Sequence, residues 1–265
     1  MPELAEVEFY RRCWVAGLGE RVTAVELHVS ARVFRRCDTV ALTRSLPGAI
    51  FRQAHSHGKQ MLFQFSQAAW LGIHLGMSGK LSVQPAAYAA IRHDHLVLRQ
   101  RKRALVFTDA RMFGRVRFDN SRDRPPAWWD ALPPAILGRN FTVSHLSRGL
   151  LRRHRSPVKA ALLDQAVFPG IGNWMADEIL WRVQLHPLTQ CETLDPLTLR
   201  KLWRITRWVS RQAISLIGSD WSELPDSWLF RHRWSKNQPC PRCGTLLRRE
   251  AAATRTTCWC PTCQS

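Results

Sequence analysis

The first residues of the chain carry the groups that imine chemistry requires. The sequence opens Met1-Pro2-Glu3, and an initiator methionine is usually removed before a residue as small as proline. Pro2 would then present a terminal secondary amine, which titrates roughly two units or more below a lysine and is nucleophilic when unprotonated. Glu3 supplies an adjacent carboxylate, so the pair could attack an aldehyde-like carbon and move protons as the adduct collapses. The alternative is structural, because proline and acidic residues also favour a helix N-terminus.

Two Cys-x-x-Cys pairs near the end of the chain form a second chemical pattern. Cys240 and Cys243 are followed, after sixteen residues, by Cys260 and Cys263. Four thiolates at this spacing are typical of a zinc ribbon, and full sulfur coordination leaves no position for water, so we expect one structural Zn²⁺. A redox pair or a metal-free structural role is the alternative. Cys258 alternates with Cys260 along a strand and is expected to point away from the metal.

A glycine turn between two helical segments forms the third pattern. A helix that begins near Pro157 is interrupted by Phe168-Pro169-Gly170, and the next helix starts at Asn173 after Ile171 and Gly172. Glycines allow close backbone approach, and a helix N-terminus presents unpaired N–H groups, so the turn could hold a phosphate. An ordinary helical hairpin is the alternative.

The charge of the chain indicates a polyanionic partner. Lys and Arg number 39 against 20 Asp and Glu, which gives a net charge of +19, with 45% hydrophobic residues. A foldable chain with this excess most simply binds nucleic acid. The hairpin between the cysteine pairs, with its tip near 248–255, would carry Arg249 and Arg255 toward DNA.

The positions of hydrophobic residues indicate no membrane or export segment. No stretch approaches 18 uninterrupted apolar residues, and a basic segment followed by an apolar one is missing at the N-terminus. We therefore expect a soluble protein of the cytoplasm that makes no contact with a membrane. The clustering of cysteines fits metal binding in a reducing compartment.

The elements that must position these groups follow from hydrophobic periodicity. A helix is predicted over 4–18, directly behind the amine. Short β-rich runs follow, which predict a β-sandwich; they are 21–30, 61–65, 70–75, 80–84, 95–99, 104–108 and 115–118. Helices are then predicted over 143–154, 157–167, 173–184, 195–217 and near 225–232. His93 and His95 are interpreted as structural residues at a strand edge.

This pattern predicts an α+β multidomain protein with a helix and sandwich first, a helical domain second and a zinc ribbon last. The predicted boundaries are 1–120 for the first domain, 121–135 for a proline-bearing linker, 136–236 for the helical domain and 237–265 for the ribbon.

Five ordered motifs between residues 2 and 263 resemble the formamidopyrimidine-DNA glycosylase (Fpg/Nei) family. They are Pro2-Glu3-Leu4, His74-Leu75-Gly76-Met77-Ser78-Gly79, Thr108-Asp109-Ala110-Arg111-Met112-Phe113-Gly114, Gly170-Ile171-Gly172-Asn173 and the paired Cys-x-x-Cys. The resemblance implies a helix-two-turns-helix domain and a bifunctional glycosylase and AP lyase of base excision repair, acting as a monomer on damaged double-stranded DNA. In a bacterial cytoplasm such an enzyme would be nucleoid-associated when bound to DNA.

The resemblance also implies roles for individual residues. Pro2 would attack C1′ of a damaged nucleotide and expel the base, and β- and δ-elimination from the imino intermediate would cut the strand. Glu3 would be its acid/base partner, and Glu6 would support it electrostatically. Lys59 would reach the phosphate beside the lesion, and Arg255 would act with it.

Other residues implied by the resemblance would hold the DNA. Met77, Arg111 and Phe113 would fill the space left by the extruded nucleotide and contact the opposite base. All three together favour the formamidopyrimidine-type branch over the endonuclease VIII-type branch. Lys159 and Asn173 would join the phosphate contacts.

The chain departs from the family pattern in three places. Ala5 replaces a proline and Met112 a common arginine, and neither change removes a catalytic group. The segment 220–239 is short and nearly devoid of glycine, where members that excise 8-oxoguanine carry a longer glycine-rich loop. We therefore expect activity on ring-opened purines, oxidised pyrimidines or abasic sites, with weak excision of 8-oxoguanine. An AP lyase without glycosylase activity and a non-catalytic lesion-binding protein are the alternatives.

Overall fold

The chain folds into two compact units, each with its own hydrophobic core. The computed structural model describes residues 1–28, 30–122, 124–235, 237–252 and 255–264. Unit 1 comprises Met1–Pro2 and Glu6–Leu132, and unit 2 comprises Glu3–Ala5 and Pro133–Ser265. The described part of the chain contains no helix that is both long and apolar enough to cross a membrane.

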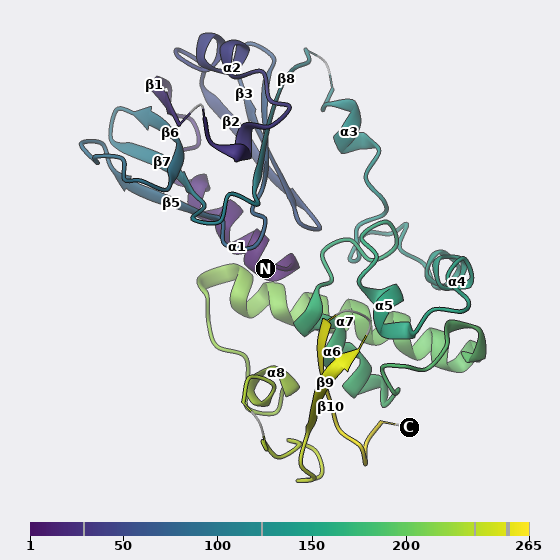
Figure 1. Ribbon diagram of the computed structural model, residues 1–265. Coiled ribbons are helices and arrows are strands. Elements are labelled where there is room, and N and C mark those ends of the chain that lie inside the picture. The colour runs from purple at the N-terminus through teal and green to yellow at the C-terminus, as the bar shows by residue number, and fades with distance from the viewer. Residues whose placement is uncertain (29, 123, 236, 253–254, 265) are drawn as a thin grey trace. The chain divides into compact units, whose positions relative to one another are not determined.

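Unit 1 is a β-sandwich with one long helix (Figure 1). Its helices are α1 (Leu4–Val15), whose first two residues belong to unit 2, α2 (Thr39–Ser45) and α3 (Ala127–Asp130), with a short 3₁₀ helix at Arg32–Phe34. Its strands are β1 (Val22–Leu27), β2 (Phe51–His57), β3 (Gln60–Phe65), β4 (Ala69–His74), β5 (Lys80–Pro85), β6 (Asp94–Gln100), β7 (Arg103–Thr108) and β8 (Arg115–Asn120). They form two four-stranded antiparallel sheets in the orders β1-β6-β7-β5 and β2-β3-β4-β8. Apolar residues of both sheets share one core with Trp14 of α1.

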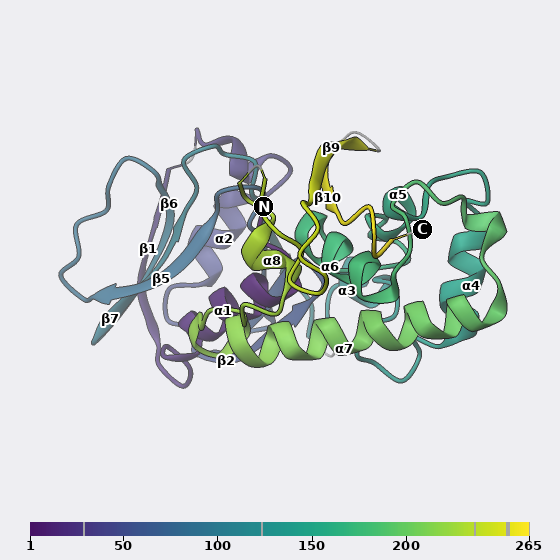
Figure 2. The same cartoon turned by 90° about the horizontal axis from the view of Figure 1, so that it is seen from below.

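Unit 2 is built around a central helix (Figure 2). Its helices are α4 (Val143–Leu151), α5 (Val158–Leu162), α6 (Asn173–Val183), α7 (Pro196–Asp220) and α8 (Leu229–His232), with a 3₁₀ helix at Cys191–Thr193. Its strands β9 (Arg248–Ala252) and β10 (Arg255–Trp259) form an antiparallel hairpin. Helix α6 contacts α7 on one side and α8 and β10 on others, and nearly every residue of α6 is buried. These elements confirm the expected fold class of helix, sandwich, helical domain and cysteine-bearing hairpin.

Several predicted boundaries were wrong. The sequence prediction omitted β2 and α2, extended the strand of β1 to residue 30 and carried the helix of α5 to residue 167, whereas α5 ends at Leu162. The first helix ends at Val15, before Gly17, where a Cβ atom would lie 2.7 Å from the Gln100 side chain and 2.9 Å from that of Leu105. The predicted hairpin tip includes residues 253 and 254, which lie outside the described part of the chain.

Candidate functional site

Glu3 is fixed at the N-terminal end of helix α6. It is almost completely buried, and its carboxylate accepts hydrogen bonds from the backbone N–H groups of Gly172, Trp174 and Met175 at 2.9, 2.9 and 3.1 Å. The first N–H groups of a helix have no partners within the helix and carry partial positive charge, so an anionic carboxylate is stabilised there. The turn predicted to bind a phosphate therefore holds a carboxylate of the same chain.

The glycines of this turn are required by close approach and backbone conformation. A Cβ atom on Gly172 would lie 2.2 Å from the carboxyl carbon of Glu3, so a larger residue would displace the acid. Gly170 has a φ of 96°, a left-handed conformation that glycine adopts without strain. The carbonyl of Gly170 accepts a hydrogen bond from the Leu4 N–H at 3.0 Å. Glu3 is thus held by hydrogen bonds to its own side chain and by the backbone hydrogen bond of its neighbour Leu4.

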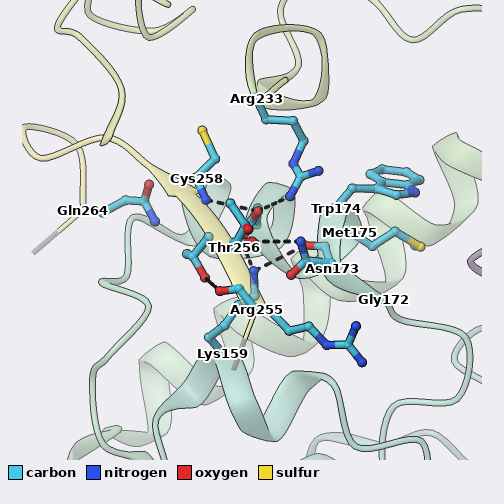
Figure 3. A network of polar contacts seen from close by, with 12 residues as sticks. Lys159, Gly172, Asn173, Trp174, Met175, Arg233, Arg255, Thr256, Cys258 and Gln264 are labelled. Atoms are coloured by element: carbon cyan, nitrogen blue, oxygen red, sulfur yellow. Dashed lines mark hydrogen bonds and ion pairs between the residues drawn. The ribbon is translucent and has the colours of Figure 1, made fainter. Parts of the chain in front are cut away.

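Asn173 connects the glycine turn to the cysteine-bearing hairpin. It is the first residue of α6, and its side-chain N–H₂ donates to the carbonyl of Thr256 in β10 at 2.8 Å. Its side-chain oxygen is buried and has no hydrogen-bond partner among the residues that the structure describes. Arg255 precedes Thr256, is exposed, and points away from this network (Figure 3). The structure therefore brings Asn173 and Arg255 onto one surface of unit 2.

Lys159 lies inside the protein instead of on its DNA-facing surface. Its side chain is fully buried, forms an ion pair with Asp177, and donates to the backbone carbonyl of Asn173. Asp177 also accepts hydrogen bonds from the guanidinium of Arg233 and from the Cys258 N–H. An ammonium enclosed in this way cannot contact a phosphate directly. The expectation that Lys159 clamps a phosphate does not fit this burial. The buried Lys159 side chain instead stabilises the start of α6.

The four predicted metal ligands lie together. The sulfur atoms of Cys240, Cys243, Cys260 and Cys263 all lie within 4.8 Å of one another. The closest pairs, 3.4, 3.5 and 3.9 Å apart, match the edge of about 3.8 Å expected for tetrahedral Zn–S bonds of about 2.3 Å. The indole N–H of Trp181 donates to the Cys240 sulfur at 3.3 Å. These residues fit one structural zinc ion, which would tie the two ends of the hairpin together.

Cys258 differs from the four clustered cysteines. It is buried beside Asp177, and burial together with that carboxylate raises the pKa of the Cys258 thiol to about 12. A thiol that stays protonated is a poor metal ligand, because the thiolate is the binding form.

In unit 1, Lys59 lies in the turn between β2 and β3. It precedes Gln60, which lines a pocket of about 200 Å³ with Arg35, His74, Phe113 and Arg115. Burial, followed by the nearby charges of Lys59 and several arginines, lowers the pKa of His74 to about 4. Nδ1 of the neutral imidazole accepts the Gly76 N–H at 3.0 Å. The surroundings of Lys59 are therefore positively charged, as a phosphate contact requires.

Met77, Arg111 and Phe113 come from two loops that one buried carboxylate holds together. Asp109 accepts hydrogen bonds from the Ser78 hydroxyl at 2.6 Å and from the Gly114 N–H at 2.7 Å. Phe113 is 43% exposed, with the Arg111 guanidinium 4.9 Å from its ring centroid. Met77 is half-buried. The structure brings this predicted trio together on unit 1.

Two further predicted residues lie at the start of the chain. Pro2 is half-buried and precedes α1, whereas Glu6 lies within the first turns of that helix and, after the larger effect of burial, contributes to raising the pKa of Tyr10. Three residues with structural roles in the site received no role from the sequence: Asp109, Asp177 and Arg233. Asp109 stands inside a quoted motif, whereas the ion pairs of Asp177 join positions 18 and 56 residues away, which no local pattern reveals.

Comparison with known proteins agrees with this arrangement. Three family models match in order: the formamidopyrimidine-DNA glycosylase N-terminal domain over 1–116, the formamidopyrimidine-DNA glycosylase H2TH domain over 132–223 and a zinc finger found in FPG and IleRS over 237–265. A formamidopyrimidine-DNA glycosylase from Roseiflexus is 36% identical, with 100% of both chains covered.

Solved structures with the same fold carry damaged DNA. One is the wild-type Lactococcus lactis enzyme with DNA that contains an oxidised pyrimidine, and another is a mutant of that enzyme with DNA that contains Fapy-dG. Each is 26% identical to this chain, covers 99% of both chains and superposes with a TM-score of 0.87. The chain described here belongs to the formamidopyrimidine-DNA glycosylase family.

Proposed function

We propose that this protein is a bifunctional DNA glycosylase and AP lyase of base excision repair that removes oxidised or ring-opened bases. The observation that carries the proposal is the placement of Glu3, which three N–H groups of the α6 turn hold in the position next to Pro2. Family membership and the DNA complexes of the Lactococcus lactis enzyme support it.

The proposed reaction begins at the nitrogen of Pro2 after removal of Met1. Its lone pair attacks C1′, the N-glycosidic bond breaks, and the departing base takes up a proton. Glu3 acts in proton transfer as the sugar ring opens to the imine, and Glu6 supports it electrostatically. Loss of the 3′ phosphate by β-elimination and of the 5′ phosphate by δ-elimination then cuts the strand.

The proposed DNA contacts are of two kinds, contacts with phosphates and contacts that replace the extruded nucleotide. Lys59, Asn173 and Arg255 contact phosphates, while Met77, Arg111 and Phe113 replace the extruded nucleotide. Lys159 is not part of this set, because it is fully buried and ion-paired. The zinc held by the four clustered cysteines is structural and supports the hairpin that carries Arg255.

Borohydride trapping on damaged duplex DNA tests the proposal. A covalent adduct with a duplex that contains an intact damaged base supports glycosylase action. An adduct with preformed abasic sites alone supports the AP lyase alternative, which the short segment 220–239 would permit, and no adduct with either supports a non-catalytic binder. Mass spectrometry of the trapped chain should show Met1 absent and the adduct on Pro2, and Pro2→Gly and Pro2→Thr should abolish trapping.

The lesion preference is part of the same proposal. Because segment 220–239 is short, we expect ring-opened guanine to be excised much faster than 8-oxoguanine paired with cytosine. Equal rates of excision in steady state would contradict this expectation.

Assembly and domain limits complete the proposal. We expect a monomer of the bacterial cytoplasm, nucleoid-associated when bound to DNA, with the domains 1–120, 136–236 and 237–265 joined by the linker 121–135. Light scattering during gel filtration tests the oligomeric state, and limited proteolysis tests the linker.

A further inference from the structure

The segment that follows α7 carries aromatic side chains that pack one against the next, in T-shaped contacts, starting from α6. The ring of Phe230 meets the ring of Trp174 with centroids 4.8 Å apart, and the ring of Trp234 meets that of Phe230 at 5.3 Å. Exposure rises along the series, because Trp174 is 4% exposed, Phe230 is half-buried and Trp234 is 55% exposed. We call these three residues the aromatic shelf.

The aromatic shelf is fixed by buried polar groups behind it. The Phe230 N–H donates to the buried carboxylate of Glu178 at 3.0 Å. The guanidinium of Arg233 lies 4.8 Å from the centroid of the Trp234 ring and forms an ion pair with the buried Asp177. A cation over a tryptophan face is an attractive contact. The exposed part of Trp234 is therefore held in a defined orientation.

The shelf is continuous with the proposed catalytic acid. Trp174, whose ring begins the shelf, donates its backbone N–H to Glu3 at 2.9 Å. The N-terminus of α6 thus holds the proposed catalytic carboxylate through the backbone of Trp174. The side chain of Trp174 is the first ring of the aromatic shelf, whose far end is exposed. An exposed aromatic face connected in this way to the proposed acid is chemically matched to a nucleobase, because every base presents a π-face.

We propose that the aromatic shelf receives the damaged base of the extruded nucleotide, with the exposed ring of Trp234 stacking on it and Phe230 supporting that ring in an edge contact, while Pro2 acts on the sugar. This inference rests on the proposed glycosylase function. Stacking recognises a flat ring and not a particular pattern of hydrogen-bonding groups, so the shelf favours planar oxidised bases as a class. It fills the role that a flexible capping loop would otherwise perform, in a segment with almost no glycine.

The test compares base excision with cleavage of a preformed abasic site, which has no base to stack. Trp234→Ala in the full zinc-loaded protein should lower kcat/KM for a planar lesion such as 5-hydroxycytosine about tenfold or more, since stacking on an aromatic side chain contributes that much per base. Cleavage of the abasic site should change less than about twofold. Excision of 5,6-dihydrothymine, whose saturated ring is puckered, should fall less than that of the planar base.

Matched variants separate stacking from packing. Trp234→Phe should retain most of the planar-lesion activity, whereas Trp234→Leu, apolar but not aromatic, should not. Trp221→Ala removes another exposed tryptophan, 48% exposed, at the end of α7 and should change neither activity. If Trp234→Ala proves unstable, the comparison of Trp234→Phe with Trp234→Leu tests the inference in its place.

The outcomes separate this inference from the proposed function. Equal losses on planar lesions, puckered lesions and abasic sites, or no loss at all, would overturn the shelf while leaving the glycosylase in place. A wild-type protein that cleaves abasic sites but excises no base would also overturn the shelf, and would identify the lyase. A wild-type protein that forms no borohydride adduct with any of these substrates would remove both proposals.

Discussion

At the level of single residues, the candidate site depends on close contacts that a substitution would disturb. Glu3 has a backbone amide on each side of its carboxylate, and the missing side chain of Gly172 creates the space that the carboxylate occupies. Asp109 performs a similar task in unit 1, where it ties the loop of Ser78 to the loop of Gly114. In both places a carboxylate organises backbone N–H groups, so a loss of one donor or of one glycine should affect function before it affects the fold.

Gly172→Ala should lower abasic-site cleavage about 100-fold, because a shift of about 1 Å in a catalytic group can cost that much. The added Cβ would lie 2.2 Å from the carboxyl carbon of Glu3 and would force the acid to move. Single-turnover cleavage with matched zinc content measures the effect. Gly149→Ala is the control, because its Cβ would meet Val167 at 2.3 Å, an equally severe clash within unit 2 that does not involve Glu3. A similar loss of activity in both variants would show that general destabilisation is responsible.

His74 predicts a defined dependence of stability on pH. Its pKa is about 4 in the folded chain and 6.5 as an ordinary histidine, so the unfolded chain binds the proton more tightly. The folded state therefore loses stability as the pH falls from about 6.5 to about 4, by on the order of 2 kcal/mol. His74→Asn keeps an acceptor for the Gly76 N–H but cannot titrate, so its stability should fall less over this interval. Urea unfolding at several pH values measures the difference, and His154→Asn, at an exposed position, should behave as the wild type.

At the level of elements, the hairpin of β9 and β10 is attached to the rest of unit 2 in two ways. Zinc ligands lie at its base, and Asp177 and Asn173 bind the backbone of β10 at Cys258 and Thr256. Because Arg255 stands at the start of β10, both attachments determine where its guanidinium lies. Removing one partner of a buried ion pair is strongly destabilising, about 3–5 kcal/mol, so Asp177 matters to the hairpin as much as a metal ligand does.

Cys243→Ser should lose zinc and weaken binding to DNA that contains an abasic-site analogue, because the base of the hairpin is no longer tied. Cys258→Ala should retain one zinc per chain, since its sulfur is outside the four-cysteine cluster. Metal analysis by mass spectrometry, with fluorescence anisotropy for DNA binding, distinguishes the two. Zinc loss in Cys258→Ala with retention in Cys243→Ser would reverse the assignment of ligands.

The sequence predicted those elements whose signals are local. The paired cysteines, the Gly170 turn and the apolar runs of β3 and β4 lie within a few residues of each other, and the structure contains each of them. Strand β2 was missed because Phe51–His57 is mostly polar and Phe51 is its single buried residue, so it shows no apolar alternation. Helix α2 is short and depends on Asp38, whose side chain accepts the Ala41 N–H at its start. The burial of Lys159 could not be predicted, because its ion pair with Asp177 is a long-range contact that only the folded chain creates.

At the level of the whole molecule, the charge of +19 makes DNA affinity depend strongly on salt. Each phosphate that a cation neutralises adds about 0.9 to the slope of log affinity against log salt. The total slope therefore counts phosphate contacts, and changes in the slope identify which residues make them. Removing an exposed cation that contacts a phosphate should reduce the slope, whereas removing a buried cation of the same charge should not.

Arg255→Ala should reduce the magnitude of that slope by about one, because Arg255 is exposed beside Asn173 and is proposed to contact a phosphate. Lys159→Met removes a charge of the same sign but should leave the slope unchanged, since the ammonium is fully buried against Asp177, which keeps Arg233 as a partner. Trp234→Ala should also leave it unchanged, because stacking releases no counterion. Anisotropy titrations from about 50 to about 200 mM salt give the slopes. A reduction of one unit for Lys159→Met would mean that this lysine leaves its buried position and reaches the DNA backbone after all.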